Sequence, residues 1–419
     1  MTVEMALERA LEIADRFADP DADELPTDQA WWHQSLAHGA PGIAVLHSEL
    51  AAAGQRPFRR VHDWLTVAAS STVTTGETTG LFYGAPAIAY ALAHAAVVRP
   101  SAYQRALADL DVRVAADAHR RAEAAHDRIA AGHLPHMAEF DTIRGLAGVG
   151  AYLLYRDPHG PALRSILGYL VRLTQPLADP SDTGQLLPGW WTLTGPTGRI
   201  DPDFPGGHGN FGLAHGVAGP LAVLAHCARQ GVRVAGQRDA IATICSWLDA
   251  WRIDTDTGYR WPYMITRREL TTRPAHVHHS GAARRPSWCY GTAGIARCLQ
   301  LAALALGDDT RRSTAEAALV CALTDPAHRA LTADASLCHG YAGLARIAAH
   351  AAADAAEPAA SQLRALVPDL LSHALTQPTT ATPGLLEGAA GIALAVLTAI
   401  TEPSGEAPVP HGWDAFLLI

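Results

Sequence analysis

The sequence predicts an all-α protein, an α/α toroid in which seven outer helices surround seven inner helices, with irregular or short β insertions. Three observations lead to this fold class. A short glycine-containing stretch recurs seven times, each stretch precedes a nearly uncharged apolar run, and more highly charged helical segments lie between these runs. A helix that is apolar all round is buried, whereas a helix with a charged face lies at the surface. The alternation therefore indicates two concentric layers of helices.

The glycine stretches mark where the predicted inner helices begin. A repeating unit of under about 50 residues is typical of repeat proteins, and the second to fourth units carry insertions. Glycines let neighbouring helix starts approach closely and tolerate a strained turn. If the inner helices are parallel, their N-terminal ends, with free N–H groups and partial positive charge, meet at one end of the ring. The first glycines of the seven stretches are Gly39, Gly84, Gly145, Gly216, Gly291, Gly340 and Gly388.

The predicted outer helices are the charged segments between these runs. Two insertions, 178–210 and 253–286, are rich in proline, glycine and aromatic residues, and the alternation at 259–263 predicts a short strand pair. Long ordered loops of this kind usually form a cleft or a lid. The apolar end, 410–419, is predicted to pack against the core. The outer helices are predicted at about residues 2–17, 56–70, 102–131, 160–177, 234–252, 309–323 and 358–377.

Composition narrows the class of protein. The internal repeat allows all 419 residues to form one domain, 1–419. A formal net charge of −9 without a basic stripe argues against a nucleic-acid partner. The six cysteines do not resemble a disulfide framework, and the N-terminus does not resemble a signal peptide. The longest apolar stretch, 388–400, is too short for a transmembrane segment of about 20 residues. We therefore expect a reduced, cytoplasmic location.

Cys289, Cys338 and His339 are the strongest candidates for chemistry. They occupy matching places in two units, Cys289-Tyr-Gly-Thr-Ala-Gly294 and Cys338-His-Gly-Tyr-Ala-Gly343. Zinc prefers thiolate and imidazole ligands, and three protein ligands with one open position are typical of a catalytic site. The alternative is that all three are ordinary core residues, but burial alone does not predict the repetition. The other four cysteines lie within helical runs and are assigned to the core.

His215 and Asp141 are weaker candidates. His215 precedes its glycine as Tyr290 and His339 precede theirs, and an imidazole there can move protons near neutral pH. A helix-capping or core histidine is the alternative, because His38 holds the equivalent place in the first unit. Asp141 lies four residues before Gly145 and would orient a histidine or pair with an arginine. An N-cap is its alternative role.

Three residues around Cys289 complete the candidate site. Arg285 would bind a carboxylate or an enolate, with a solvated loop charge as the alternative. Tyr290 flanks the predicted ligand Cys289 directly. Trp288 would form a wall of the pocket, but ordinary packing explains it as well. Residue type and position alone do not decide whether any of the three has a catalytic role.

The motifs resemble those of the lanthionine synthetase C-like family. The resemblance rests on Trp288-Cys-Tyr-Gly-Thr-Ala-Gly294 and Leu337-Cys-His-Gly-Tyr-Ala-Gly343, with Ala214-His-Gly216 upstream and Gly384-Leu-Leu-Glu-Gly388 downstream. It covers essentially the whole chain, which looks like the separate cyclases of class I lanthipeptide systems. It implies an α/α toroid. Some members carry a small β domain that contacts the leader peptide, whereas residues 100–140 here are predicted to be helical.

The resemblance also implies an activity and roles for the site residues. The activity is Michael addition of cysteine thiols to dehydroalanine or dehydrobutyrine, which forms thioether rings in a dehydrated precursor peptide with a leader. A dehydratase and an exporter are the implied partners, which would place the protein in the cytoplasm or at the periphery of a membrane-associated complex. The implied zinc ligands are Cys289, Cys338 and His339, and the implied catalytic residues are His215, Asp141, Arg285, Tyr290 and Trp288.

Two other functions remain open. One is a toroidal zinc enzyme similar to protein prenyltransferases, which also activate a peptide thiol but usually have an aspartate ligand and need a basic diphosphate pocket. The other is a non-catalytic member of the same family that binds glutathione or thiol peptides, or docks partner enzymes. Such a scaffold would bind a peptide and leave its thiols unchanged.

Overall fold

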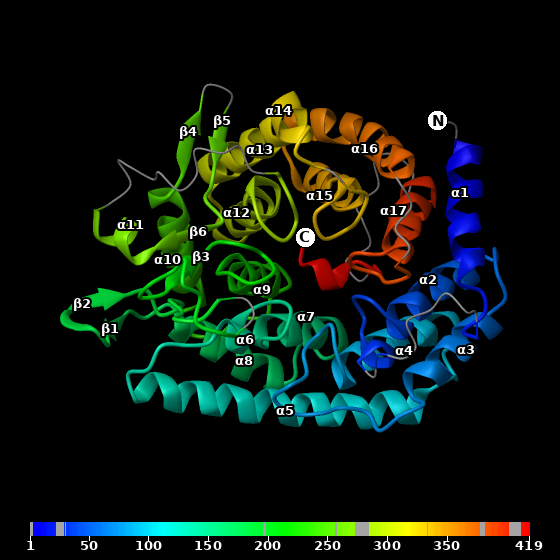
Figure 1. Cartoon of the computed structure of the whole chain (residues 1–419), viewed down its shortest axis with the longest axis horizontal. Coiled ribbons are helices and arrows are strands. Elements are labelled where there is room, and N and C mark those ends of the chain that lie inside the picture. Colours follow the sequence, from blue (N-terminus) through cyan, green and yellow to red (C-terminus); the bar gives the residue numbers. More distant parts are fainter. Residues whose placement is uncertain are drawn as a thin grey trace. The chain divides into compact units, whose positions relative to one another are not determined.

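The computed structural model describes residues 3–21, 29, 31–195, 198–255, 258–272, 285–332, 334–377, 382–401 and 412–419. Helices dominate this part of the chain (Figure 1). The chain divides into two compact units, residues 1–114 with 332–416 and residues 115–331 with 417–419. A single domain over 1–419 therefore stays a prediction.

In the first unit, four helices begin directly after a predicted glycine and are buried nearly throughout. They are α2 (Ala40–Ala52), α4 (Ala85–Val98), α15 (Tyr341–Asp354) and α17 (Ala389–Thr401). Helix α2 packs against α4 and α17, and α15 packs against α17. The more exposed helices packed on them are α1 (Val3–Arg16), α3 (Arg59–Ala68) and α16 (Ala359–Thr376), and a 3-10 turn, η1 (Trp32–Gln34), precedes α2.

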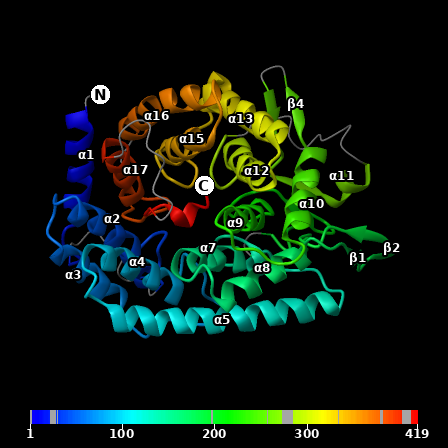
Figure 2. The same cartoon turned by 180° about the vertical axis from the view of Figure 1, so that it is seen from behind.

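The second unit repeats this arrangement. Three buried helices, α7 (Leu146–Arg156), α9 (Ala218–Arg229) and α12 (Thr292–Leu306), follow their glycines within two residues. Helix α9 packs between α7 and α12, as Figure 2 shows from behind. The amphipathic helices here are α8 (Pro161–Leu173), α10 (Gln237–Ala250) and α13 (Asp309–Thr324), and α5 (Gln104–Ala130) contains the boundary between the units. Three short helices are α6 (Met137–Phe140), α11 (Arg267–Thr272) and α14 (Pro326–Arg329).

The predicted alternation of helices is therefore confirmed. Seven glycine-started helices and seven charged helices lie in the described part of the chain, each within a few residues of its predicted range. The second glycine of a stretch has a steric reason. A Cβ on Gly294 would lie 2.3 Å from the Trp288 carbonyl oxygen, and one on Gly343 would lie 2.0 Å from that of Leu337. Glycine lets the loop fold back onto the first turn of its helix.

In the described residues of the insertions, the strands form three short antiparallel pairs. The strand pair predicted from the alternation at 259–263 is only partly right, because β5 (Gly258–Arg260) pairs with the preceding β4 (Ile253–Thr255) and residues 261–263 are in no strand. At the other insertion, β1 (Leu177–Asp179) pairs with β2 (Asp182–Leu187). The third pair joins the two insertions, because β3 (His208–Asn210) pairs with β6 (Met264–Thr266). Sequence alternation did not reveal this pairing. It matters for the site, because β3 is followed at once by the loop that carries His215.

The C-terminal segment is buried, as its apolar residues predicted. Trp413, Phe416 and Ile419 are buried, and a 3-10 turn, η4 (Ala415–Leu417), lies near its end. Residues 410 and 411 of the predicted segment lie outside the described residues. Among the described helices, none combines the length and the apolar character needed to cross a bilayer.

Candidate active site

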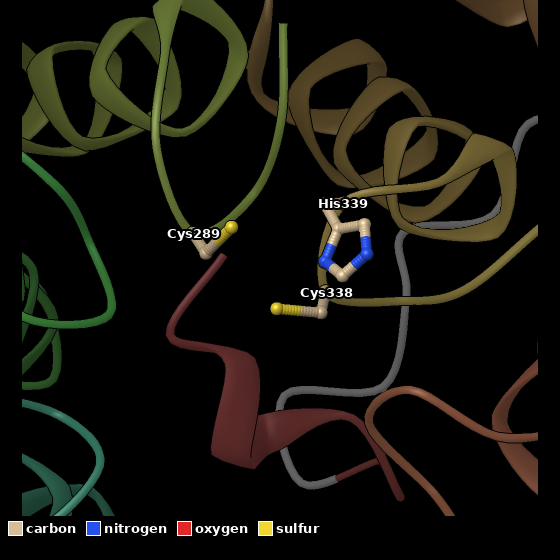
Figure 3. A group of neighbouring side chains, drawn as sticks. All are labelled: Cys289, Cys338 and His339. Carbon is tan, nitrogen blue, oxygen red and sulfur yellow. The ribbon is translucent and has the colours of Figure 1, made fainter. Parts of the chain in front are cut away.

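The structure brings Cys289, Cys338 and His339 together. One ligand atom from each residue lies within 4.8 Å of the other two, and Figure 3 shows the two sulfur atoms and the imidazole facing one another. Both cysteines are buried and His339 is half-buried. Two thiols and an imidazole suit a soft divalent ion, and three such ligands leave one tetrahedral position for another molecule. This is a group of side chains that can hold a metal ion.

The loop that carries Cys338 and His339 is a shared feature of the repeats. The His339 N–H donates to Ser336 Oγ at 3.2 Å, and in the first glycine repeat the His38 N–H donates to Ser35 Oγ at 3.1 Å. The first glycine repeat has Ala37 at the position that Cys338 occupies in this loop. Loop geometry thus belongs to the repeat, and the thiol is what distinguishes this copy.

Asp334 contacts the predicted histidine ligand and was not identified from the sequence. Its Oδ2 atom lies 3.0 Å from His339 Nε2. Burial would raise the pKa of Asp334, but hydrogen bonds from His339 and Ser336 outweigh burial and lower the pKa to about 2. A carboxylate that engages Nε2 leaves Nδ1 as the nitrogen that could bind a metal ion, and it holds the ring in one orientation. In the sequence, the only indication of this contact is that an aspartate lies five residues before His339.

Asp141 and His215 form a pair. His215 Nδ1 lies 2.7 Å from Asp141 Oδ2, and the other carboxylate oxygen accepts the N–H groups of Arg144 and Gly145, both at 2.7 Å. Asp141 is 1% exposed. One oxygen therefore pairs with His215 and the other holds the turn before α7, but Asp141 is not the N-cap residue of this helix, which is Gly145. Thr142 ties the two loops together, because its hydroxyl donates to the Leu213 carbonyl at 2.6 Å.

Tyr290 lies beside this pair. Its ring centroid is 6.4 Å from that of His215 and 5.3 Å from that of Tyr263. The Asn210 side-chain amide donates to the Tyr290 hydroxyl at 3.0 Å. Asn210 and Tyr263 were noted in the sequence only as loop and strand residues. Their role at the site follows from the β3–β6 pairing, which places Asn210 opposite Met264, next to Tyr263.

Trp288 and Arg285 lie on the same loop as Cys289. Trp288 is 1% exposed, and its indole N–H donates to the Leu417 carbonyl at 2.8 Å, as ordinary packing would have it. Arg285 is half-buried, and its carbonyl accepts a hydrogen bond from the Tyr263 hydroxyl at 2.9 Å. Among the contacts between described residues, none involves its guanidinium. Catalytic roles for both residues stay predictions.

The other cysteines mostly follow the core assignment. Cys227, Cys245 and Cys298 are buried inside helices, and burial raises the pKa of each thiol to about 12. Such thiols are poor ligands and nucleophiles at neutral pH. Cys321 is only half-buried.

The sequence and the fold define the class of protein. The family model "Lanthionine synthetase C-like protein" matches residues 30–410. Nisin biosynthesis protein NisC of Lactococcus lactis subsp. lactis is 26% identical over 323 residues, which is 75% of this chain and 72% of that protein. A solved structure of nisin cyclase matches with a TM-score of 0.78 and 21% identity, covering 98% of this chain and 96% of that one.

The fold class is therefore an α/α toroid, as the helix pattern predicted. The enzyme class is that of a lanthipeptide cyclase. The chain belongs to the lanthionine synthetase C-like family.

Proposed function

We propose that this protein is a zinc-dependent cyclase that forms lanthionine and methyllanthionine rings in a dehydrated precursor peptide. The observation that carries the zinc dependence is the meeting of two thiols and an imidazole within 4.8 Å. Cys289, Cys338 and His339 would hold the ion, with Asp334 orienting His339. Bound zinc would supply a Lewis acid that lowers the pKa of the substrate cysteine thiol.

The reaction adds the substrate S–H across a C=C bond. The sulfur bonds to the β-carbon of a dehydroalanine or dehydrobutyrine, and a proton goes to the α-carbon. His215 would move that proton, because Asp141 engages Nδ1 and leaves Nε2 for exchange. Arg285 would face the negative charge that develops on the substrate. Tyr290 and Trp288 would line the site on either side of Cys289.

The test is ring closure in a dehydrated peptide with free cysteines. Closure leaves the peptide mass unchanged and removes thiols that react with an alkylating reagent. We expect Cys289→Ala to lose bound zinc and at least about 100-fold in rate, the scale of removing one strong transition-state contact. Cys298→Ala, a buried cysteine of α12 outside the cluster, is the matched control and keeps its zinc. Equal closure rates for Cys289→Ala and the wild type would exclude zinc catalysis.

The same assay separates the two other functions. A scaffold that only binds thiol peptides would retain the peptide and leave every thiol open to alkylation. A prenyl-transferring enzyme would increase the peptide mass in the presence of a prenyl diphosphate. The Asp141–His215 pair supports proton transfer and hence the cyclase.

We also propose the setting in which the cyclase works. NisC is a nisin biosynthesis protein, which supports a leader-bearing precursor peptide as the substrate here and a dehydratase and an exporter as partners. The chemistry needs reduced substrate thiols, which the cytoplasm provides. Co-purification of the tagged protein with a dehydratase from its own host would test the partnership.

A further inference from the structure

Asn210 is a buried side chain with three hydrogen-bond partners, one of which is the Met137 sulfur at 3.4 Å from its Nδ2 atom. It is 1% exposed. Its Nδ2 atom lies 3.0 Å from the Tyr290 hydroxyl oxygen, and its Oδ1 atom accepts the Gly212 N–H at 3.0 Å. The Asn210 carbonyl also accepts the Val217 N–H at 3.0 Å, across the turn that carries His215. One residue therefore touches both the His215 turn and Tyr290.

The Gly212 contact determines which way the amide points. A backbone N–H can only donate, so the atom facing Gly212 is the amide oxygen. The amide nitrogen then faces Tyr290 and can only donate. The Tyr290 oxygen consequently accepts this hydrogen bond, and its own O–H proton points to an acceptor other than Asn210.

The surroundings hold this arrangement rigidly. The Phe211 N–H donates to the Tyr263 carbonyl at 3.0 Å, which extends the β3–β6 pairing beside the Tyr290 ring. A Cβ on Gly212 would lie 2.7 Å from both the Tyr290 ring and the Cys289 carbonyl oxygen. The turn therefore packs directly on the loop of the predicted ligand Cys289, and glycine is needed there for close approach.

We propose that Asn210 is a positioning residue for ring closure. It holds Tyr290 so that the phenol donates its proton toward the substrate, where negative charge develops on the carbonyl oxygen as the thiolate adds. The inference rests on the proposed cyclase function. It assigns Tyr290 the part of a hydrogen-bond donor, and it gives the β3–β6 pair the part of orienting that donor.

Asn210→Asp separates this role from simple support of the turn. The aspartate keeps an oxygen for the Gly212 N–H, but its second oxygen can only accept from Tyr290. The tyrosine proton then turns toward residue 210 and away from the substrate. We expect kcat for ring closure to fall by about 10-fold or more, while KM for the peptide changes by less than about 2-fold.

A double-mutant cycle with Tyr290→Phe identifies the cause. Without the phenol hydroxyl, Asn210→Asp should change kcat by less than about 2-fold, because the two substitutions remove the same interaction. Thr142→Val is the matched control, since Thr142 also hydrogen-bonds the His215 segment but does not contact Tyr290. Its effect should be the same in both backgrounds. The Tm and the zinc content of each variant, compared with those of the wild type, would show whether the variant is folded.

Three results would overturn the role of Asn210 while the wild type still closes rings. These are an unchanged kcat in Asn210→Asp, an unchanged kcat in Tyr290→Phe, and an Asn210→Asp loss that persists in the Tyr290→Phe background. The last would show that the added charge acts on His215 directly. A wild-type protein that closes no rings would overturn the proposed function, and with it this role.

Discussion

Asp141 Oδ2 lies 2.7 Å from His215 Nδ1, although 74 positions separate the two residues in the chain. A carboxylate can only accept, so this contact places the imidazole proton on Nδ1 of the neutral ring. Nε2 is then the nitrogen that can take up and release a proton. The second oxygen of Asp141 holds two backbone N–H groups, which keeps the carboxylate from rotating.

Asp141→Asn should abolish most ring closure without unfolding the protein. The amide oxygen can still accept the Arg144 and Gly145 N–H groups, but the amide nitrogen then faces His215 Nδ1 and forces the opposite tautomer. We expect the rate to fall by about 10²–10⁴-fold with a small change in Tm. Asp141→Ala also leaves two N–H groups unpaired and should cost about 1–3 kcal/mol of stability. A wild-type rate in Asp141→Asn would show that imidazole orientation is unimportant.

Asp334→Asn should weaken metal binding. The carboxylate engages His339 Nε2, and loss of such an outer contact typically lowers metal affinity by about 10–100-fold. Competition with a chromogenic chelator would measure the affinity. Asp325→Asn is the control, because Asp325 accepts the Ala327 N–H at the start of α14 and has no role at the predicted metal ligands. Equal affinities in the two variants would exclude an orienting role for Asp334.

Gly294→Ala should damage the Cys289 loop. Its Cβ would lie 2.3 Å from the Trp288 carbonyl oxygen, so the loop has to move, at a cost of about 1–3 kcal/mol. Zinc content and Tm should both fall. Gly168→Ala, in α8, meets nothing within 4 Å and should stabilise the helix by about 0.5–1 kcal/mol. If both variants behave alike, close approach is not the reason for glycine at 294.

Asp414→Asn should destabilise the protein in a pH-dependent way. Burial would raise the pKa of Asp414, but the charges of Arg346 and His350 and their hydrogen bonds, each at 2.8 Å, lower it well below its usual value. A lowered pKa in the folded state contributes stability above the unfolded pKa of about 3.9, and this contribution is lost as the pH falls further.

The measurement is the Tm of wild type and Asp414→Asn between neutral pH and pH 3. Because both Asp414 and Arg346 are buried, we expect a loss of about 3–5 kcal/mol at pH 7 that shrinks below about pH 4. Asp15→Asn is the control, since Asp15 pairs with Arg56 and Arg60 at the surface and should cost less than about 1 kcal/mol. A pH-independent loss in Asp414→Asn would contradict the buried charge pair.

Much of the fold was predictable because its signals are local. Helices α4 and α12 follow their glycines at once and are nearly uncharged, and such a pattern involves residues only a few positions apart. The Cys289 and Cys338 loops were recognisable for the same reason. Asn210 and Tyr263 were not, because each contacts Tyr290 only through a strand pairing between two insertions whose register no local pattern specifies.

The sequence by itself determined the helical class, the repeat, and which thiols and imidazole stand at the start of α12 and α15. Only the tertiary structure decided which polar atoms meet. Asp141 Oδ2 faces His215, Asp334 faces His339 Nε2, and the amide nitrogen of Asn210 faces Tyr290. Buried polar groups require partners. Which partner each one finds depends on packing between segments far apart in the chain, and residue spacing does not encode that.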